Sequence, residues 1–317
     1  MKKLLTLGAI LMLFATSLLA LSGCSASGSV KEFLASALQE ETLQVTEQFH
    51  SVHILSDTEN VKLLPAEDGV CRIVSYNEKD ITYTATVEQS ILKIRREDAR
   101  KWYERIFSIG EKTLTVYLPK REYNALTIEQ DTGDVTIPAD FHITGDLTLT
   151  LSTGDVDVRA SVDGALDITA STGNVCVADT VCGTLDITAS TGNVCVADTV
   201  CGALAVRVST GDVTLTSVCC TNLLSTGNTG DIRMTDVIAN GLISLERSTG
   251  HVSMDRCDAA ELLITTDTGD VVGTLLSDKI FIVRTRTGNI DVPETVVGGK
   301  CKITTNTGDI EITIAAT

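Results

Sequence analysis

The chain has 317 residues and a formal net charge of −17, with 42 Asp and Glu against 25 Lys and Arg. The charge is uneven, because residues 126–317 hold 26 acids and 10 bases whereas residues 24–125 hold 16 acids and 13 bases. Such an acidic surface repels nucleic acid and anionic lipid headgroups, which excludes both as partners of residues 126–317. Cations and basic proteins remain as partners.

The first 24 residues have the pattern of an export signal. Two lysines, Lys2 and Lys3, precede an uncharged and mostly apolar run from Leu4 to Leu21, which is typical of a secretory signal rather than of a fold element. The run ends in Leu-Ser-Gly-Cys at 21–24, which resembles the lipobox of bacterial lipoproteins. The resemblance implies that residues 1–23 are removed and that a lipidated Cys24 holds the chain on the extracytoplasmic face of a membrane. An uncleaved signal anchor is the alternative.

The next hundred residues predict a tether and a β cap. Residues 24–48 begin with the flexible run Ser-Ala-Ser-Gly-Ser, and residues 30–42 have the pattern of a short amphipathic helix. Residues 49–125 contain short runs of alternating hydrophobicity that predict strands and a cap over the first repeat. These runs are Ser51–Leu55, Asn60–Leu64, Cys71–Tyr76, Ile81–Val87, Ile91–Arg95 and Thr113–Leu118.

From residue 126 to residue 317 the chain is a tandem repeat. The motif Thr-Gly-(Asp/Asn/His)-(Val/Ile) recurs at intervals of 19 to 21 residues. Its glycines are Gly133, Gly154, Gly173, Gly192, Gly211, Gly230, Gly250, Gly269, Gly288 and Gly308. Ten copies at such a short and regular period indicate a solenoid.

Aliphatic residues keep fixed distances from each glycine. Leu, Ile or Phe stands seven residues before it in nine copies, and Val or Ile stands two residues after it in all ten. Alternation with a period of two on both sides predicts a strand, a glycine corner and a second strand, each with one buried face. The sequence therefore predicts an all-β, single-stranded β-solenoid of about ten rungs of 19–20 residues, with an N-terminal β cap.

Two local features add to this prediction. Residues 164–182 and 183–201 differ at one position only, which indicates a recent duplication and a function that tolerates an added rung. The last apolar run, Ile310–Ile314, has no obvious cap, so we expect an exposed edge strand there and edge-to-edge self-association at the C-terminal rung.

Several segments together resemble a known family. Phe-His-Ser-Val-His-Ile at 49–54, Leu-Lys-Ile-Arg at 92–95, Leu-Thr-Val-Tyr-Leu-Pro at 114–119 and the serial Ser-Thr-Gly-Asp-Val corners are similar to the putative-adhesin repeat domains of bacterial surface proteins. The resemblance covers about residues 45–315. It implies a β-solenoid at a cell surface and carries over no catalytic residues.

The acidic residues of the corners are a candidate cation site. Asp134, Asp155, Asp212, Asp231, Asp270 and Asp309 follow their glycines and would stack at the rung spacing of roughly 4.8 Å. Calcium is the one cofactor that this arrangement suggests, because carboxylates stacked so closely repel one another and a divalent cation relieves the repulsion. The alternative is that the column consists of solvated turn residues.

A second candidate is the only basic and aromatic stretch of the chain. Residues 93–121 hold nine Lys and Arg against four acids, together with Trp102, Tyr103 and Phe107. We expect an interaction patch at Arg95, Arg96, Arg100, Lys101 and Trp102. A solvated loop between strands is the alternative.

Other chemistry has weaker support. Ten cysteines are present, and the nine that remain after lipidation are an odd number without a Cys-x-x-Cys pair, so we expect free thiols and no bound metal. The serines of the corners, such as Ser152 and Ser171, have no His and Asp partners at a fixed offset.

The functional prediction is a non-enzymatic envelope lipoprotein that presents an acidic solenoid as an adhesion or protein-interaction surface. An accessory component of an envelope-stress sensing system is the alternative. A polysaccharide-acting enzyme comes third, because bases are sparse in the early rungs and carbohydrate platforms are absent: residues 126–317 contain only Phe141 and Phe281 as aromatic residues.

Overall fold

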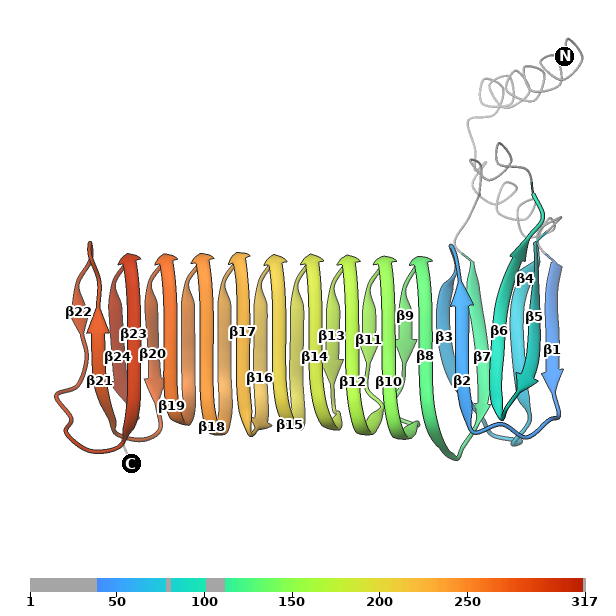
Figure 1. The fold of residues 1–317 in the computed structure, drawn as a ribbon, viewed down its shortest axis with the longest axis horizontal. Coiled ribbons are helices and arrows are strands. Elements are labelled where there is room, and N and C mark those ends of the chain that lie inside the picture. The colour runs from blue at the N-terminus through green and yellow to red at the C-terminus, as the bar shows by residue number, and fades with distance from the viewer. Residues whose placement is uncertain (1–38, 78–80, 101–111, 316–317) are drawn as a thin grey trace, which may run out of the picture.

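The computed structural model describes residues 39–77, 81–100 and 112–315. These residues form a straight rod of stacked β-coils without a helix, which confirms the predicted β-solenoid (Figure 1). None of the described residues belongs to a helix long and apolar enough to cross a membrane. Cys24, Lys101 and Trp102 lie outside the described residues.

The stack is built from a long strand, a glycine corner and a second strand, repeated in parallel. The aliphatic columns predicted by the repeat stack in register, as Leu147, Leu166 and Leu185 do on three successive coils. The strands of the central stack are β8 (Glu122–Thr132), β9 (Val135–Ile137), β10 (His142–Thr153), β11 (Val156–Val158), β12 (Ser161–Thr172), β13 (Val175–Ala178), β14 (Val181–Thr191), β15 (Val194–Thr210), β16 (Val213–Cys220), β17 (Asn222–Thr229), β18 (Ile232–Thr249), β19 (Val252–Thr268) and β20 (Val271–Leu275).

The glycine corner is required by backbone geometry. All ten repeat glycines have φ between +121° and +151°, a conformation that L side chains rarely adopt. A Cβ atom on Gly173 would lie 1.9 Å from the carbonyl oxygen of Gly154 on the preceding coil. Successive corners therefore stack backbone on backbone, and only glycine fits.

The N-terminal region adds two coils and a cover. Residues 51–66 pair in parallel with β8 and β9 on one side and with β6 and β7 on the other, although β6 and β7 come later in the chain. Three further strands cover this end with antiparallel pairings, β5 on β6, β4 on β7 and β1 on β4. The strands are β1 (Gln39–Val45), β2 (Ser51–Ser56), β3 (Asn60–Ala66), β4 (Cys71–Asn77), β5 (Ile81–Glu88), β6 (Ile91–Asp98) and β7 (Thr113–Pro119).

The helix predicted over residues 30–42 is wrong where the structure describes it. Residues 39–42 belong to β1, and residues 30–38 lie outside the described range. The alternating residues Leu43 and Val45 pack against the core, and the backbone of β1 pairs with the edge of β4. Pairing with that open edge overrides the weak local preference for a helix.

The C-terminal coils also change places. The chain leaves β20 and forms β21 (Lys279–Arg284) and β22 (Ile290–Asp291), and then returns as β23 (Gly299–Thr307) and β24 (Ile310–Ile314). This last segment lies between β19–β20 and β21–β22 and pairs with both. The prediction of an exposed edge at Ile310–Ile314 is therefore wrong, because the open edge belongs to β21 and β22 (Figure 1).

The core is a continuous aliphatic column with several buried polar residues, of which Arg247 has the largest side chain. Arg247 lies almost fully buried in a column that holds aliphatic or small residues on the preceding coils. Its guanidinium donates to Ser225 Oγ at 3.2 Å and occupies the space beside Gly227, where a Cβ atom would lie 2.8 Å from Arg247 Nη1. The serine that breaks the aliphatic pattern is therefore the hydrogen-bond partner of a buried arginine.

Candidate functional site

The acidic residues of the corners form a hydrogen-bonded ladder along the rod. Asp134 Oδ1 accepts the backbone N–H of Asp155, and Asp155 Oδ1 accepts that of Asn174, so each side chain binds the next coil. The N···O and N···N distances lie between 2.6 and 3.1 Å along the full series, which runs from Asn60 through Asp134, Asp155, Asn174, Asn193, Asp212, Asp231, His251, Asp270 and Asp309 to the backbone of Asn289.

The ladder gives the column a structural role that the sequence alone did not reveal. The residue after each corner glycine needs a side-chain atom that accepts a hydrogen bond. Asp and Asn both provide an acceptor oxygen, and His251 provides its Nδ1 atom. Sequence reasoning missed Asn60, because Glu59 replaces the glycine of that corner. The remaining signal was the Asn-Val pair at 60–61, which matches the Asp-Val pair of the repeat.

Charge in the column is partly neutralised by arginines from neighbouring positions. Arg233 lies 2.7 Å from both Asp212 and Asp231, and its hydrogen bond holds the pKa of Asp212 below its usual value. Within the described part of the chain, no three or more His, Cys, Asp and Glu side chains are grouped to hold a metal ion. Calcium binding by Asp134, Asp155, Asp212, Asp231, Asp270 and Asp309 stays a prediction.

Removing one acceptor of the ladder tests its structural role. We expect Asp155→Ala to lower the free energy of unfolding by about 1 kcal/mol, because the exposed N–H of Asn174 loses a charged acceptor but regains water. Asp155→Asn is the matched control and should change stability by less than about 0.5 kcal/mol, because asparagine serves at Asn174 and Asn193. Equal losses in the two variants, measured by urea denaturation, would contradict the ladder.

Two arginines of the predicted basic patch lie within ion pairs. Arg96 is only 4% exposed and forms ion pairs with Asp57 at 2.6 Å and Glu59 at 3.0 Å. Arg100 binds Asp98 at 2.7 Å. The side chains of Arg96 and Arg100 are therefore held in ion pairs and largely buried, at 4% and 10% exposure, and the interaction patch stays a prediction. Arg95 alone of the described members is exposed.

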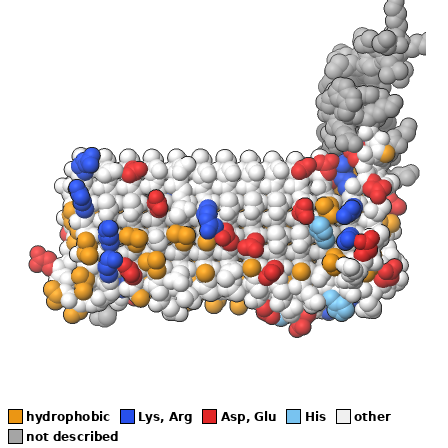
Figure 2. Space-filling view, in the orientation of Figure 1, with side chains coloured by type: hydrophobic (Ala, Val, Ile, Leu, Met, Phe, Trp, Pro, Cys, Tyr) orange, Lys and Arg blue, Asp and Glu red, His pale blue; other side chains and the backbone are white. Residues whose placement is uncertain are grey.

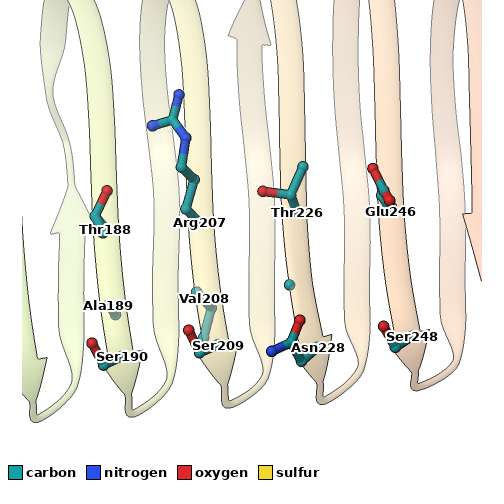
Figure 3. A pocket seen from close by; sticks show the side chains of 11 residues that line it. Thr188, Ala189, Ser190, Arg207, Val208, Ser209, Thr226, Asn228, Glu246 and Ser248 are labelled. Atoms are coloured by element: carbon teal, nitrogen blue, oxygen red, sulfur yellow. The ribbon is translucent and has the colours of Figure 1, made fainter.

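A shallow polar hollow lies over the coil that contains Gly227. Its volume is about 320 Å³, and Arg207 and Glu246 stand on either side of Thr226, as Figure 3 shows. Hydroxyl and amide groups of the next column line its lower part, namely Ser190, Ser209, Asn228 and Ser248. Arg207 is already paired with Asp186 at 2.6 Å. The hollow is a feature of the rod's surface and has no pair of side chains arranged for general acid and base catalysis.

An exposed apolar stripe runs along one edge of the rod. Val181, Val200, Cys219 and Ile238 occupy the same position on four successive coils and stack in register. The valines are 58% and 53% exposed. Two residues before them, at a corner with φ between +46° and +54°, stand Asp179, Asp198, Ser217 and Asp236. We call these eight positions the stripe, which combines apolar side chains with an acidic margin.

The cysteines are thiols in the described residues. Cys176 stacks on Cys195, and Cys182 stacks on Cys201, because each pair occupies equivalent positions of the duplicated coils. Burial raises the pKa of Cys176 to about 11 and that of Cys220 to about 12. These two thiols are therefore protonated at neutral pH.

The chain resembles several solved structures in fold only. One is a Bacteroides fragilis protein described as a putative adhesin, with 14% sequence identity and a TM-score of 0.41. The alignment covers 87% of this chain and 97% of that protein. A Parabacteroides distasonis protein described as a putative lipid binding protein is 12% identical and has a TM-score of 0.44. The alignment covers 88% of this chain and 97% of that protein. A second P. distasonis protein, described as a putative adhesin, is 13% identical, with 86% and 96% covered and a TM-score of 0.40.

No curated protein matches the chain. One family model does, and its two matches, over residues 49–235 and 199–317, together span the cap and every glycine corner of the stack. The two matches cover more than half of the chain, and the chain belongs to the Toastrack DUF4097 family.

Proposed function

We propose that the protein is a non-enzymatic cell-envelope lipoprotein, anchored through Cys24, that presents its acidic solenoid as an adhesion or protein-interaction surface. The observation that carries the proposal is the stripe, in which exposed valines stack in register on successive coils. Contiguous apolar side chains at a surface mark interaction sites more often than isolated ones do.

The chemistry of the stripe indicates the class of partner. Asp179 and Asp198 flank Val181 and Val200, so a partner gains most if it offers apolar side chains beside Lys or Arg. The acidic charge of the stack steers such a basic partner toward the rod and repels anionic polymers. An extended basic segment of an envelope protein fits these requirements.

The duplicated coils support a surface that acts by repetition. The residues of the two copies pair one to one, so the added coil extends the stripe by one valine and one aspartate. A contact of this kind strengthens as rungs are added, because several equivalent contacts act together.

The test is a pull-down from the native envelope with residues 25–317 and with the variant Val181→Ser/Val200→Ser. We expect the variant to lose at least half of the captured partner while its melting temperature stays unchanged, since both valines are more than half exposed. Thr150→Ala/Thr169→Ala, which changes exposed residues on another column, is the control. Equal capture by all three proteins would contradict the stripe, and capture of a membrane sensor kinase would favour the stress-sensing alternative.

The anchor makes a separate prediction. We expect Cys24→Ala to abolish incorporation of labelled fatty acid, because acylation needs the thiol of that cysteine. The variant protein should either be released from membranes after processing or keep its signal sequence uncleaved. Cys219→Ala, at an exposed thiol of the stack, is the control and should leave lipidation unchanged. Fatty-acid label that persists in Cys24→Ala would show that the anchor lies elsewhere.

A further inference from the structure

The end of the rod opposite β1 leaves one strand edge open. We call residues 276–298, with β21 and β22, the tip (Figure 1). Among the described residues β21 pairs with β23 only, so its other edge presents free backbone N–H and C=O groups, apart from the Lys279 carbonyl, which accepts the hydroxyl of Thr295. The position two residues after the repeat glycine faces the interior in the other coils. At the tip this position is Ile290, which is 46% exposed.

The middle of the open edge lacks the usual protections against pairing, because the charged residues of β21, Lys279 and Arg284, stand at its two ends. Natural edge strands carry inward-pointing charges, lysines or prolines that prevent contact with another strand. In β21 four apolar residues follow one another, Ile280 to Val283, and Lys279 is buried with its Nζ 2.6 Å from Asp258. Pro293 follows β22 and protects only that short strand.

Charge distribution restricts what can cover the tip. Residues 126–275 hold 21 acids against 5 bases, whereas residues 276–317 hold 5 of each. Two copies of this chain therefore repel each other along the sides of their stacks, whereas their tips approach without net charge repulsion. Figure 2 shows apolar and basic side chains gathered at this end of the rod.

The described strands at the opposite end differ from the tip in direction and in side chains. Its outermost strands β1 and β5 run antiparallel to their neighbours, and they carry Glu40 and Glu41 in β1 and alternating threonines in β5. Head-to-tail stacking into a filament is therefore disfavoured, and the remaining arrangement is symmetric.

We propose that two copies of the chain join tip to tip, with β21 of one copy pairing antiparallel with β21 of the other across a two-fold axis. Each copy contributes the same edge and the same exposed Ile280 and Ile282, as an isologous contact requires. Coils inside the stack have a paired coil on each side, and the tip of a second copy supplies the missing neighbour of the last coil.

The dimer has a consequence for adhesion, and this part rests on the proposed anchoring at Cys24. The twelve coils give a rod about 50 Å long, so the dimer is about 100 Å long with its N-terminal ends at opposite extremities. Two anchored copies then join when they come from facing membranes. The pair bridges two surfaces, and the partner at the tip is the protein itself.

The test uses residues 25–317, which keep every coil, in three forms whose masses are measured by sedimentation equilibrium. We expect dimers for the unmodified chain and monomers for Ile282→Lys, because a lysine at 51% exposure is tolerated by the fold and faces its symmetry mate in the dimer. Leu224→Lys occupies the same repeat position at mid-rod, is 38% exposed, and should remain dimeric. Circular dichroism confirms that all three are folded.

The outcomes separate the proposals. Monomers of the unmodified chain at all concentrations, dimers that persist in Ile282→Lys, or a scattering profile with doubled thickness instead of doubled length would each overturn the tip-to-tip contact. Lipidated full-length chain on phosphatidylcholine vesicles should cluster them, and Ile282→Lys should not. Dimers in solution without vesicle clustering would overturn the bridging role while leaving the contact intact.

Discussion

Gly173→Ala is expected to reduce the free energy of unfolding by more than about 4 kcal/mol, a loss that few single substitutions cause. The residue has φ of +137°, which costs an L side chain about 1–2 kcal/mol. The larger part comes from the new Cβ atom, which would lie 1.9 Å from the carbonyl oxygen of Gly154. Two stacked backbones must separate, and the ladder between Asp155 and Asn174 breaks with them.

A second glycine separates these two contributions. Gly69 also has positive φ, at +72°, but a Cβ atom there meets nothing within 4 Å. We therefore expect Gly69→Ala to cost only about 1–2 kcal/mol, the conformational part alone. Urea denaturation gives both values, and hydrogen exchange should locate the loss around residues 154–192 in Gly173→Ala. Similar losses in the two variants would show that the close stacking of corners contributes nothing.

Arg96→Met is expected to cost about 3–5 kcal/mol, because it leaves the buried carboxylate of Glu59 without its cation. Glu59 and Arg96 are both 4% exposed, and Glu59 occupies the corner position that glycine holds in later coils. Uncompensated charge at this place destabilises the coil on which the ladder begins. Thermal unfolding monitored together with hydrogen exchange of β2 and β3 measures the effect.

Two further variants make this prediction specific. Arg233→Met removes a guanidinium that is half exposed, so its cost should stay below about 1 kcal/mol. Adding Glu59→Gln to Arg96→Met should restore part of the lost stability, because a neutral amide replaces the unpaired charge. A double variant as unstable as Arg96→Met alone would argue that packing, and not charge, explains the loss.

The same network makes the N-terminal coil sensitive to acid. The hydrogen bond from Arg100 and the neighbouring Arg96 hold the pKa of Asp98 well below its usual value, despite the opposing effect of burial. The stabilisation by a carboxylate of lowered pKa is fully present above the pKa of the unfolded chain, near 3.8, and declines as the pH falls below it.

The repeat allowed the stack to be predicted almost completely. Fixed distances from each glycine gave the strands, the corner and the buried columns, because one short unit determines its own conformation and its neighbours bury its apolar face. In the cap, the runs starting at Ser51, Asn60 and Cys71 became β2, β3 and β4 with only the final residue or two displaced. Local alternation was enough to identify these strands.

The order of the coils at both ends could not be predicted in the same way. All coils present similar aliphatic faces, so the sequence does not decide that residues 299–314 lie inside residues 279–291. The choice depends on long-range competition between edges. The burial of Arg96 could not be predicted for a related reason. An arginine in a polar stretch is expected at the surface, and its ion-pair partners Asp57 and Glu59 become its neighbours only in the folded chain.

The exchanged coils have a mechanical consequence. A chain that ended on its outermost coil would unzip one hydrogen bond at a time when pulled from its terminus. Here β23 and β24 are held from both sides, and so are β2 and β3 near the other terminus. A load applied at the C-terminal side must shear two strand interfaces at once, whereas a load at the N-terminal side first separates β1 from β4 and only then reaches the doubly paired β2 and β3. Resistance to forced unfolding is set by this barrier rather than by equilibrium stability. The proposed anchoring at Cys24 would place this resistance along the line of pull on the rod.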